Sequence, residues 1–298
     1  MTSSIKTSRS CLVTGGSKND AAPIGVLLLN LKETQSWIDH LIVFHDGIST
    51  RDQEVAKSIL PVDFIHYSYP GNRSKFNEIV KYQYSEMVFC KYECFKLLER
   101  FQTVMWTDYD VVFQRDVGEL LEQCTNSIRT LMYRSTDEVG TLRRQLRYGK
   151  EQIVGNKYDL DTLSMATGLF VLSGNLSASP QELYEHCIRL TEEYGDCLCL
   201  PEQAIFDMLF QDFNITPEPI PWTYATHPTD KTAASAPILH AYSQPKFWNG
   251  LENEKWNAYY TQWLSMGGSR WKIGFNGWLK NIRKSLAFRL SKLFSNNI

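Results

Sequence analysis

Long apolar runs are missing from this 298-residue sequence. The longest one near the amino terminus, residues 24–29, is far too short to span a bilayer. Residues 1–10 are polar and lack the apolar segment of a signal peptide, so we expect no secretory signal there. The sequence also contains no internal repeat and no low-complexity segment. These absences favour an ordinary globular protein.

Cysteine motifs are missing as well. The seven cysteines are odd in number, no Cys-x-x-Cys occurs, and Cys197-Leu198-Cys199 is too tight for the usual zinc knuckle. We therefore expect reduced thiols in a cytosolic compartment.

A large net charge is missing, and the charges are spread unevenly along the chain. The formal net charge of -2 excludes a general electrostatic nucleic-acid binder. After Glu254, however, there is no acidic residue, whereas basic residues continue to Lys292. One arc of a helix over this tail would carry Trp278, Leu279, Ile282, Leu286, Leu290, Leu293 and Phe294, and Lys280, Lys284 and Lys292 would lie opposite.

This pattern predicts a basic amphipathic helix that binds an anionic membrane surface. A helix that packs on its own domain or on a dimer partner is the alternative. Since Gly267-Gly268-Ser269 is the best linker, we predict two parts, a catalytic domain over residues 1–266 and a membrane-associating tail over 267–298.

The rest of the chain predicts an α/β fold. Strand patterns at 10–14, 40–45, 62–67, 166–173 and 237–240 are interspersed with helical patterns at 25–35, 49–60, 78–100, 180–194 and 200–210. This arrangement favours a mostly parallel sheet with helices on both faces. We further expect a rigid turn at 217–221, and a helix plus a loop over the site, mobile until ligand binds, at 137–161.

The most informative stretch is residues 104–113. It reads as an apolar strand that ends in Asp108-Tyr109-Asp110 and continues into apolar residues. Two carboxylates this close repel each other and lose solvation when buried, so they need a partner. A divalent cation is the usual one. The pattern also occurs by chance in many chains.

Three other pieces could contribute chemistry. Gly15-Gly16 begins a turn after the first strand that suits either a nucleotide or a plain strand-to-helix connection. Glu202-Gln203 starts a helix, where an acid is most often a cap or a dipole partner. His240, followed by Lys246 and Trp248, ends a short strand, where a histidine is usually structural.

Together these pieces resemble glycosyltransferase family 8, the retaining GT-A fold enzymes that include bacterial lipooligosaccharide galactosyltransferases and glycogenin. The resemblance covers roughly residues 10 to 295. The family's motifs are matched in order and in internal spacing by residues 106–112, 166–171, 202–207 and 240–248.

The resemblance implies a GT-A fold, a nucleotide-sugar donor and a metal site. Asp108, Asp110 and His240 would hold Mn²⁺ or Mg²⁺, because mixed carboxylate and imidazole ligands suit these cations. Lys246 would bind the diphosphate. Lys91 takes the place of an arginine that often lies near the nucleotide-sugar in the family, and it keeps the charge without the bidentate fork.

The remaining implied residues surround the donor. Asn19 and Gly168 would contact the nucleotide-sugar, as would Asp108. Gln203 and Glu202 would lie beside the anomeric carbon and stabilise a cationic sugar, whether configuration is retained by front-face attack or through a covalent intermediate.

The chain also departs from the family pattern. Ala166 replaces an asparagine, and Glu202 and Ala204 each replace an aspartate. Residues 17–20 lack the aromatic side chain that usually stacks on uracil. These departures indicate an altered donor pocket and leave the nucleotide base, expected to be uracil, open.

The expected function is a metal-dependent retaining hexosyltransferase of bacterial surface polysaccharide synthesis, either lipopolysaccharide or capsule. It would act in the cytoplasm at the inner face of the membrane on a glycan or glycolipid acceptor. Two alternatives remain. One is a non-catalytic binding protein with this fold. The other is a haloacid-dehalogenase-type phosphatase, which needs a second acidic motif downstream, and only Asp159-Leu160-Asp161 fits that description. The donor sugar, the acceptor and the oligomeric state stay open.

Overall fold

The computed structural model describes residues 8–271 except 123, 125–127, 135, 136, 138, 139 and 175. The amphipathic helix expected beyond residue 271 lies outside the described residues and stays a prediction. Within the described residues, none of the helices combines the length and the apolar character that crossing a bilayer requires.

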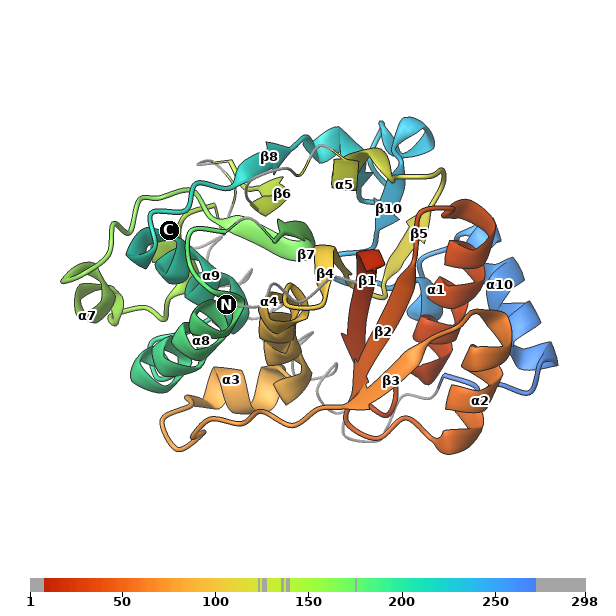
Figure 1. Cartoon of the computed structure of the whole chain (residues 1–298), viewed down its shortest axis with the longest axis horizontal. Coiled ribbons are helices and arrows are strands. Elements are labelled where there is room, and N and C mark those ends of the chain that lie inside the picture. The colour runs from red at the N-terminus through yellow and green to blue at the C-terminus, as the bar shows by residue number, and fades with distance from the viewer. Residues whose placement is uncertain are drawn as a thin grey trace, which may run out of the picture.

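A seven-stranded sheet forms the centre of the molecule (Figure 1). Its order is β3 (Asp63–His66), β2 (His40–His45), β1 (Ser8–Gly16), β4 (Phe101–Thr107), β7 (Met165–Ser173), β6 (Ile128–Met132) and β8 (Glu218–Ile220). Only β7 runs antiparallel to its neighbours in this sheet; the other adjacent pairs are parallel. The expected mostly parallel sheet is therefore confirmed.

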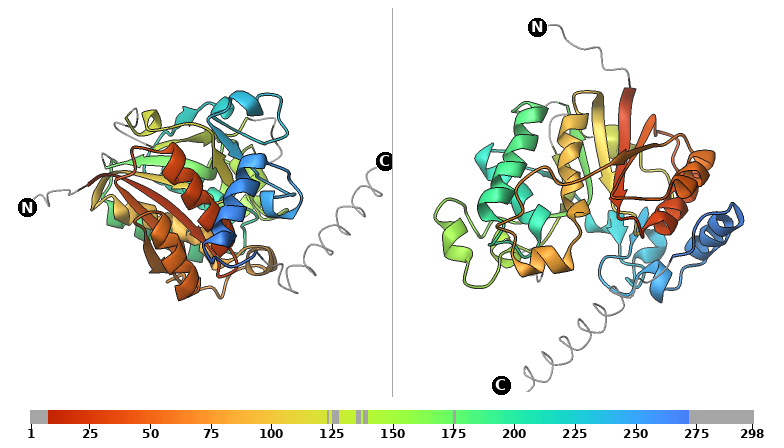
Figure 2. Two further views of the ribbon diagram at one scale, coloured as in Figure 1. Left: turned by 90° about the vertical axis from the view of Figure 1, so that its right-hand side faces the viewer. Right: turned by 90° about the horizontal axis from the view of Figure 1, so that it is seen from below.

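The strand sequences explain why helices cover both faces. All nine residues of β7 are buried, as are the last five of β2. Strands that are apolar throughout, rather than at alternate positions, need cover on both sides. Figure 2 (right) shows the two helical layers on opposite sides of the strands.

One layer contains α1 (Ala21–Thr34), α2 (Thr50–Ile59) and α10 (Glu254–Ser265). Helix α1 is buried from Ala21 to Leu31 because it lies between the sheet and α10. The two helices approach so closely at Gly25 that a Cβ there would lie 2.2 Å from the Trp263 ring. Serine and asparagine caps begin the two outer helices: Ser49 accepts from the Asp52 amide, and Asn253 accepts from the Trp256 amide.

The other layer contains α4 (Glu93–Leu97), α8 (Pro180–Tyr194) and α9 (Pro201–Asp212). Phe206 of α9 is central to its core and has edge-on contacts with Tyr92, Phe95 and Phe170. This layer carries the helix that presents Glu202 and Gln203.

The single helix predicted over 78–100 is wrong. The segment divides into α3 (Glu78–Gln83), the 3-10 helix η1 (Glu86–Tyr92) and α4. Tyr84 and Ser85 are extended between them, and the Ser85 hydroxyl accepts from the Met87 amide as a cap. Serine favours such caps over a helix interior, and periodicity alone did not reveal it. The break matters because it exposes Tyr84 and Ser85 to the cleft described below.

A small second sheet brings residues 225–240 back to the segment that follows β4. Its order is β5 (Val111–Phe113), β10 (Ile238–His240) and β9 (Ala225–Thr226). The predicted strand at 237–240 is confirmed. The turn predicted at 217–221 is instead strand β8 with its flanking residues. Pro219 is tolerated there because β8 is an edge strand.

The remaining short elements connect these layers. They are α5 (Glu119–Glu122), α6 (Leu142–Gln145), α7 (Glu151–Gly155), η2 (Trp222–Tyr224), η3 (Ala233–Ser235) and η4 (Phe247–Asn249).

Residues 267–269, expected to act as a linker, are packed on the domain. The Ser269 carbonyl accepts from Trp263 Nε1 at 2.9 Å, and its amide donates to Asp52 Oδ1 at 2.8 Å. The predicted boundary between a domain and a tail is not tested by these contacts.

Candidate active site

All of the predicted site residues except Asn19 line two adjoining cavities beside the carboxyl end of β4. The cavities have volumes of about 630 Å³ and about 420 Å³. Both are lined by Tyr84, Lys91, Asp108, Asp110, Glu202 and Lys246. The larger one extends to Gln203 and His240, and the smaller one to Gly15, Gly16 and Ser17. One cleft therefore passes on both sides of the Asp-x-Asp turn.

Strand pairing fixes the position of Asp108. Its backbone amide donates to the Gly168 carbonyl at 2.9 Å, which continues the β4–β7 ladder by one residue. Trp106 Nε1 donates to Asp108 Oδ1 at 2.9 Å, and Lys91 Nζ lies 3.4 Å from the same oxygen. The Asp108 carboxylate is thus oriented from within the protein, while its side chain stays 31% exposed to the cleft.

The small sheet brings His240 to Asp110 across about 130 residues of sequence. In the antiparallel β5–β10 pair, His240 lies opposite Val111, and the Ala241 amide donates to the Asp110 carbonyl at 2.9 Å. His240 Nε2 consequently lies 3.2 Å from Asp110 Oδ1 and 4.0 Å from Asp108 Oδ2.

Gly168 makes room for this histidine. A Cβ at Gly168 would lie 2.3 Å from His240 Cε1, closer than two carbon atoms can approach. The glycine predicted to lie beside the donor is therefore also required for the position of the His240 ring.

The three side chains fit a divalent cation. One ligand atom from each of Asp108, Asp110 and His240 can be chosen so that all lie within 4.8 Å of one another. Asp110 Oδ1 is buried, and apart from the His240 contact at 3.2 Å it has no hydrogen-bond partner among the described residues. A buried carboxylate oxygen without a donor needs a compensating partner, and mixed oxygen and imidazole ligation suits Mn²⁺ or Mg²⁺.

Lys246 reaches the same carboxylate from the other side. Its ammonium group forms an ion pair with Asp110 Oδ2 and donates to the Ala241 carbonyl at 2.6 Å. Burial alone would raise the pKa of Asp110, but His240 and Lys246 outweigh it and hold the pKa well below its usual range. Asp110 is therefore an anion at neutral pH.

Lys91 is the centre of a second, buried network. Its Nζ lies 3.0 Å from Glu202 Oε1 and 3.1 Å from Thr167 Oγ1, in addition to the contact with Asp108. Burial would lower the Lys91 pKa, yet the Asp108 and Glu202 carboxylates raise it above its ordinary value. Lys91 thus keeps its charge while buried and joins β4 to α9.

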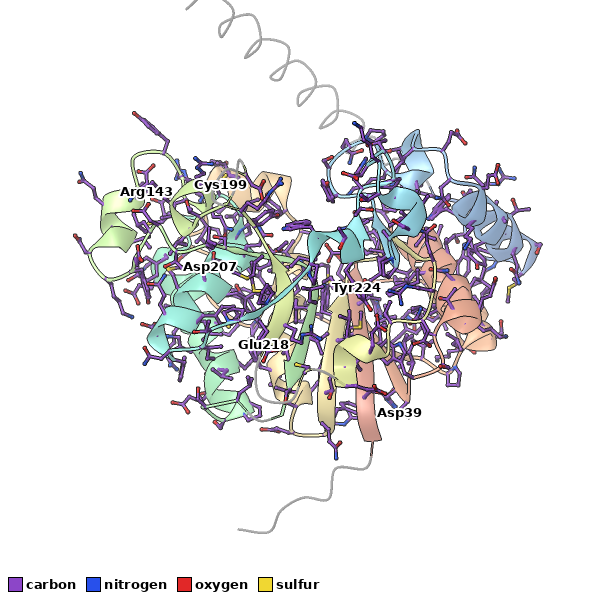
Figure 3. The ribbon with its side chains drawn as sticks, turned by 90° about the horizontal axis from the view of Figure 1, so that it is seen from above. Asp39, Arg143, Cys199, Asp207, Glu218 and Tyr224 are labelled. Atoms are coloured by element: carbon purple, nitrogen blue, oxygen red, sulfur yellow. The ribbon has the colours of Figure 1, made fainter. Side chains whose placement is uncertain are left out.

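Helix α9 is attached to β7 by two side chains one helical turn apart. Gln203 Oε1 accepts from the Thr167 amide at 3.3 Å, and Asp207 Oδ1 accepts from the Met165 amide at 3.2 Å. The β6–β7 register shifts at Thr130/Leu131, next to this region. Such an irregularity changes the direction in which neighbouring side chains of the strand point, and this one lies beside the site. Figure 3 labels Asp207 in the α9 layer.

Most of the predicted site residues meet in the cleft, and Asn19 does not. Asn19 is exposed at the outside of its turn, whereas its neighbours Ser17 and Asp20 line the smaller cavity. Thr167 lies inside a matched motif but was not among the predicted site residues, and its hydroxyl donates to Glu202 Oε1 at 2.9 Å.

Aromatic residues of the larger cavity were also missed. They are Tyr84, Tyr133, Trp222 and Tyr242. These residues come from loops and helix breaks, where periodicity offers no signal.

The strand order, the antiparallel β7 and the Asp-x-Asp turn with its distant histidine together are typical of the GT-A fold. The chain belongs to a particular family of that type. The model of glycosyl transferase family 8 matches residues 23–251, well over half of the sequence. The protein is therefore a glycosyltransferase.

Solved structures agree with this fold. The galactosyltransferase LgtC, in complex with donor and acceptor sugar analogues, has a TM-score of 0.62 at 16% identity, over 86% of this chain and 99% of LgtC. The apo bifunctional glycosyltransferase WbbM has a TM-score of 0.59 at 13% identity, over 90% of this chain and 51% of WbbM. The chain thus spans about half of WbbM.

A third structure, apo GlyE of Streptococcus pneumoniae TIGR4, has a TM-score of 0.54 at 16% identity, over 86% of this chain and 63% of GlyE. At these identities the likeness is one of fold alone. A comparison with curated protein sequences gave no match.

Proposed function

We propose that this protein is a metal-dependent, retaining hexosyltransferase. Its donor would be a nucleotide diphosphate sugar, with uracil as the expected base, and its acceptor a glycan or glycolipid of a bacterial surface polysaccharide. The observation that carries the proposal is the convergence of Asp108, Asp110, His240 and Lys246 at the point where two cavities meet.

The cleft suggests how the donor would lie. Its diphosphate would lie at the Asp-x-Asp turn, where Lys246 supplies a positive charge. The smaller cavity, bounded by Gly15, Gly16 and Ser17, would take the nucleoside. The larger cavity would take the hexose beside Glu202 and Gln203.

This arrangement suits departure of a nucleoside diphosphate. A divalent cation bound by Asp108, Asp110 and His240 would neutralise charge that develops on the diphosphate. The Lys246 ammonium group would assist as a point charge on the same oxygens. The side chains of Glu202 and Gln203 would face the sugar carbon as it gains positive character, and the Glu202 carboxylate would stabilise that charge.

Lys91 and Thr167 position these groups. Both donate to Glu202 Oε1, so they fix the carboxylate against β7 while the neighbouring Gln203 is fixed by the Thr167 amide. Positioning of this kind lowers the entropy cost of reaching the reactive geometry.

A non-catalytic sugar-binding protein is the second candidate. Ala166 and Ala204 offer no polar group where an asparagine and an aspartate are expected from the resemblance, and Ala166 lines the larger cavity. The preserved metal-type cluster and the two lysines favour catalysis. Family membership and the fold leave the phosphatase alternative without support.

The cellular setting is part of the same proposal. We place the enzyme in the cytoplasm at the inner face of the membrane, where the basic tail over 267–298 would bind anionic lipid. This placement is based on the tail's charge pattern alone.

The decisive experiment is a screen of nucleotide-sugars for Mn²⁺-dependent hydrolysis. We expect the wild type to release a nucleoside diphosphate from at least one donor, with EDTA abolishing and Mn²⁺ restoring the activity. Asp110→Ala should lose it. Hydrolysis of no donor, or equal rates in the variant, would reject the transferase proposal.

A further inference from the structure

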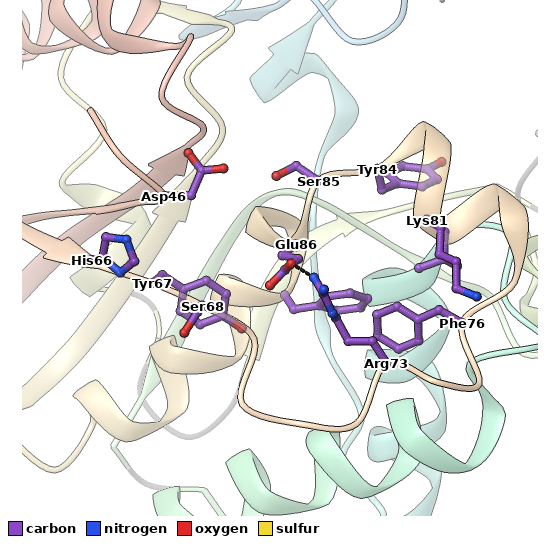
Figure 4. Close-up of a pocket in the computed structure, with 12 residues that line it drawn as sticks. Asp46, His66, Tyr67, Ser68, Arg73, Phe76, Lys81, Tyr84, Ser85 and Glu86 are labelled. Atoms are coloured by element: carbon purple, nitrogen blue, oxygen red, sulfur yellow. Dashed lines mark ion pairs between the residues drawn. The ribbon is translucent and has the colours of Figure 1, made fainter. Parts of the chain in front are cut away.

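A third cavity of about 610 Å³ adjoins the donor cleft (Figure 4). It lies at the carboxyl ends of β2 and β3, facing the segment that contains α3 and the start of η1. Tyr84 lines this cavity and both cavities of the active site, and Ser85 lines this one and the smaller of those two. The helix break at these two residues is therefore where the three spaces meet.

The inner wall of this cavity is aromatic. Tyr67, Phe76 and Phe89 line it and are each at least 95% buried, and the Phe76 and Phe89 rings lie 5.3 Å apart. The half-buried Tyr84 adds a fourth ring at the junction. The buried rings give the cavity an apolar floor, and the more exposed Tyr84 ring supplies accessible aromatic surface, which suits the apolar face of a pyranose ring.

Polar groups of both signs form the outer rim. Arg73 and Glu86 form an ion pair across it (Figure 4), and Glu86 Oε2 accepts from the Tyr69 amide at 3.3 Å. Asp46 and Lys81 contribute one further charge of each sign. The charges balance, so the rim favours a neutral, hydroxyl-rich ligand over a phosphate or another polyanion.

We propose that this third cavity binds a neutral sugar ring of the acceptor, one or more residues away from the ring that receives the transferred hexose. The proposal rests on the proposed transferase function. A receiving hydroxyl must reach the larger cavity near Gln203, and Tyr84 connects that cavity with the third one. The acceptor class is then a glycan of at least two sugar rings.

The nucleoside base is the competing occupant, and it fits less well. The smaller cavity of about 420 Å³ already adjoins the diphosphate position through Gly15, Gly16 and Ser17. The third cavity contacts neither the Asp-x-Asp turn nor Lys246.

The test measures glycan binding without turnover. Neutral disaccharides (lactose, cellobiose and maltose) and their methyl monosaccharides are titrated against the full-length protein in the presence of Mg²⁺ and UDP, with saturation-transfer NMR as the readout. Ser68→Trp fills the exposed mouth of the cavity. Ser58→Trp places the same side chain on an exposed position of α2 outside the cavity and serves as the matched control.

We expect at least one disaccharide to bind the wild type about tenfold more tightly than its methyl monosaccharide. Ser68→Trp should remove this preference, and Ser58→Trp should retain it.

Two results would overturn the inference. One is that no disaccharide of the panel binds the wild type better than its monosaccharide. The other is that Ser68→Trp weakens UDP and spares the disaccharide, which would assign the cavity to the base. Donor hydrolysis by water is measured in parallel, so a failure of the proposed function appears separately as a wild type that hydrolyses no donor.

Discussion

Replacing Lys91 with methionine tests the buried network that joins β4, β7 and α9. Lys91 is 5% exposed, and its ammonium group contacts both Glu202 and Asp108. The Glu202 side chain is only 9% exposed, so losing Lys91 leaves a nearly buried carboxylate without a counter-charge there, with the Thr167 hydroxyl as a neutral donor. Removing one partner of such a pair costs about 3–5 kcal/mol. Asp108 adds little to this figure because its side chain is 31% exposed and water can solvate it.

The assay is urea denaturation of the wild type, Lys91→Met and the double variant Lys91→Met/Glu202→Gln. We expect the single variant to lose about 3 kcal/mol or more of unfolding free energy. The double variant should recover at least about 1 kcal/mol because the amide removes the unpaired charge. Lys57→Met is the control: Lys57 and its partner Glu54 are 45% and 65% exposed, so the loss of this ion pair should cost less than about 1 kcal/mol.

Two results would refute this reasoning. The first is a loss of unfolding free energy in Lys91→Met no larger than in Lys57→Met. The second is a double variant no more stable than Lys91→Met, which would mean that the Glu202 charge is not what the lysine compensates.

Three further perturbations follow from the same structure. Gly168→Ala places a Cβ 2.3 Å from His240 Cε1 and so displaces the imidazole ring. The Mn²⁺ affinity, measured by electron paramagnetic resonance, should therefore fall about tenfold or more. Unchanged affinity would show that this ring position is not needed for metal binding. Burial raises the pKa of Asp207 to about 8, so the folded state holds a proton that the unfolded state releases near pH 4, and stability should fall as pH rises between these values. Asp207→Asn should abolish this decline, which amounts to up to a few kcal/mol of unfolding free energy at pH 8. If the melting temperatures of the two proteins changed in parallel from pH 5 to pH 8, Asp207 would not be the group responsible. Deleting residues 272–298 should release the protein from anionic liposomes in a flotation assay, and retention would refute the membrane role of the tail.

The sequence predicted the sheet and the site largely because both depend on local patterns. Apolar runs such as residues 40–45 and 166–173 identify buried strands regardless of what packs on them. The resemblance to family 8 then connected Asp108 and Asp110 with His240, a contact that no local pattern contains. The structure supplies the physical link, which is the pairing of β10 with β5.

The errors arose where a capping or edge interaction outweighs periodicity. The apolar stripe over 78–100 suits a single helix, but the Ser85 hydroxyl caps a new turn and interrupts it. Pro219 indicates a turn locally, yet an edge strand accepts a proline because one side of it makes no sheet hydrogen bonds. The position of Asn19 depended on which side of a four-residue turn faces the cleft, and a turn of that length has no periodicity to reveal this.

The central claim is that the Asp-x-Asp turn and His240 form a metal-dependent nucleotide-sugar site. The most direct measurement is a calorimetric titration of Mn²⁺ into the wild type and Asp110→Ala, each with saturating UDP. The account predicts one tight Mn²⁺ site in the wild type and an affinity at least about 100-fold lower in the variant, since a central anionic ligand is lost. Equal Mn²⁺ affinity in the two proteins would contradict it.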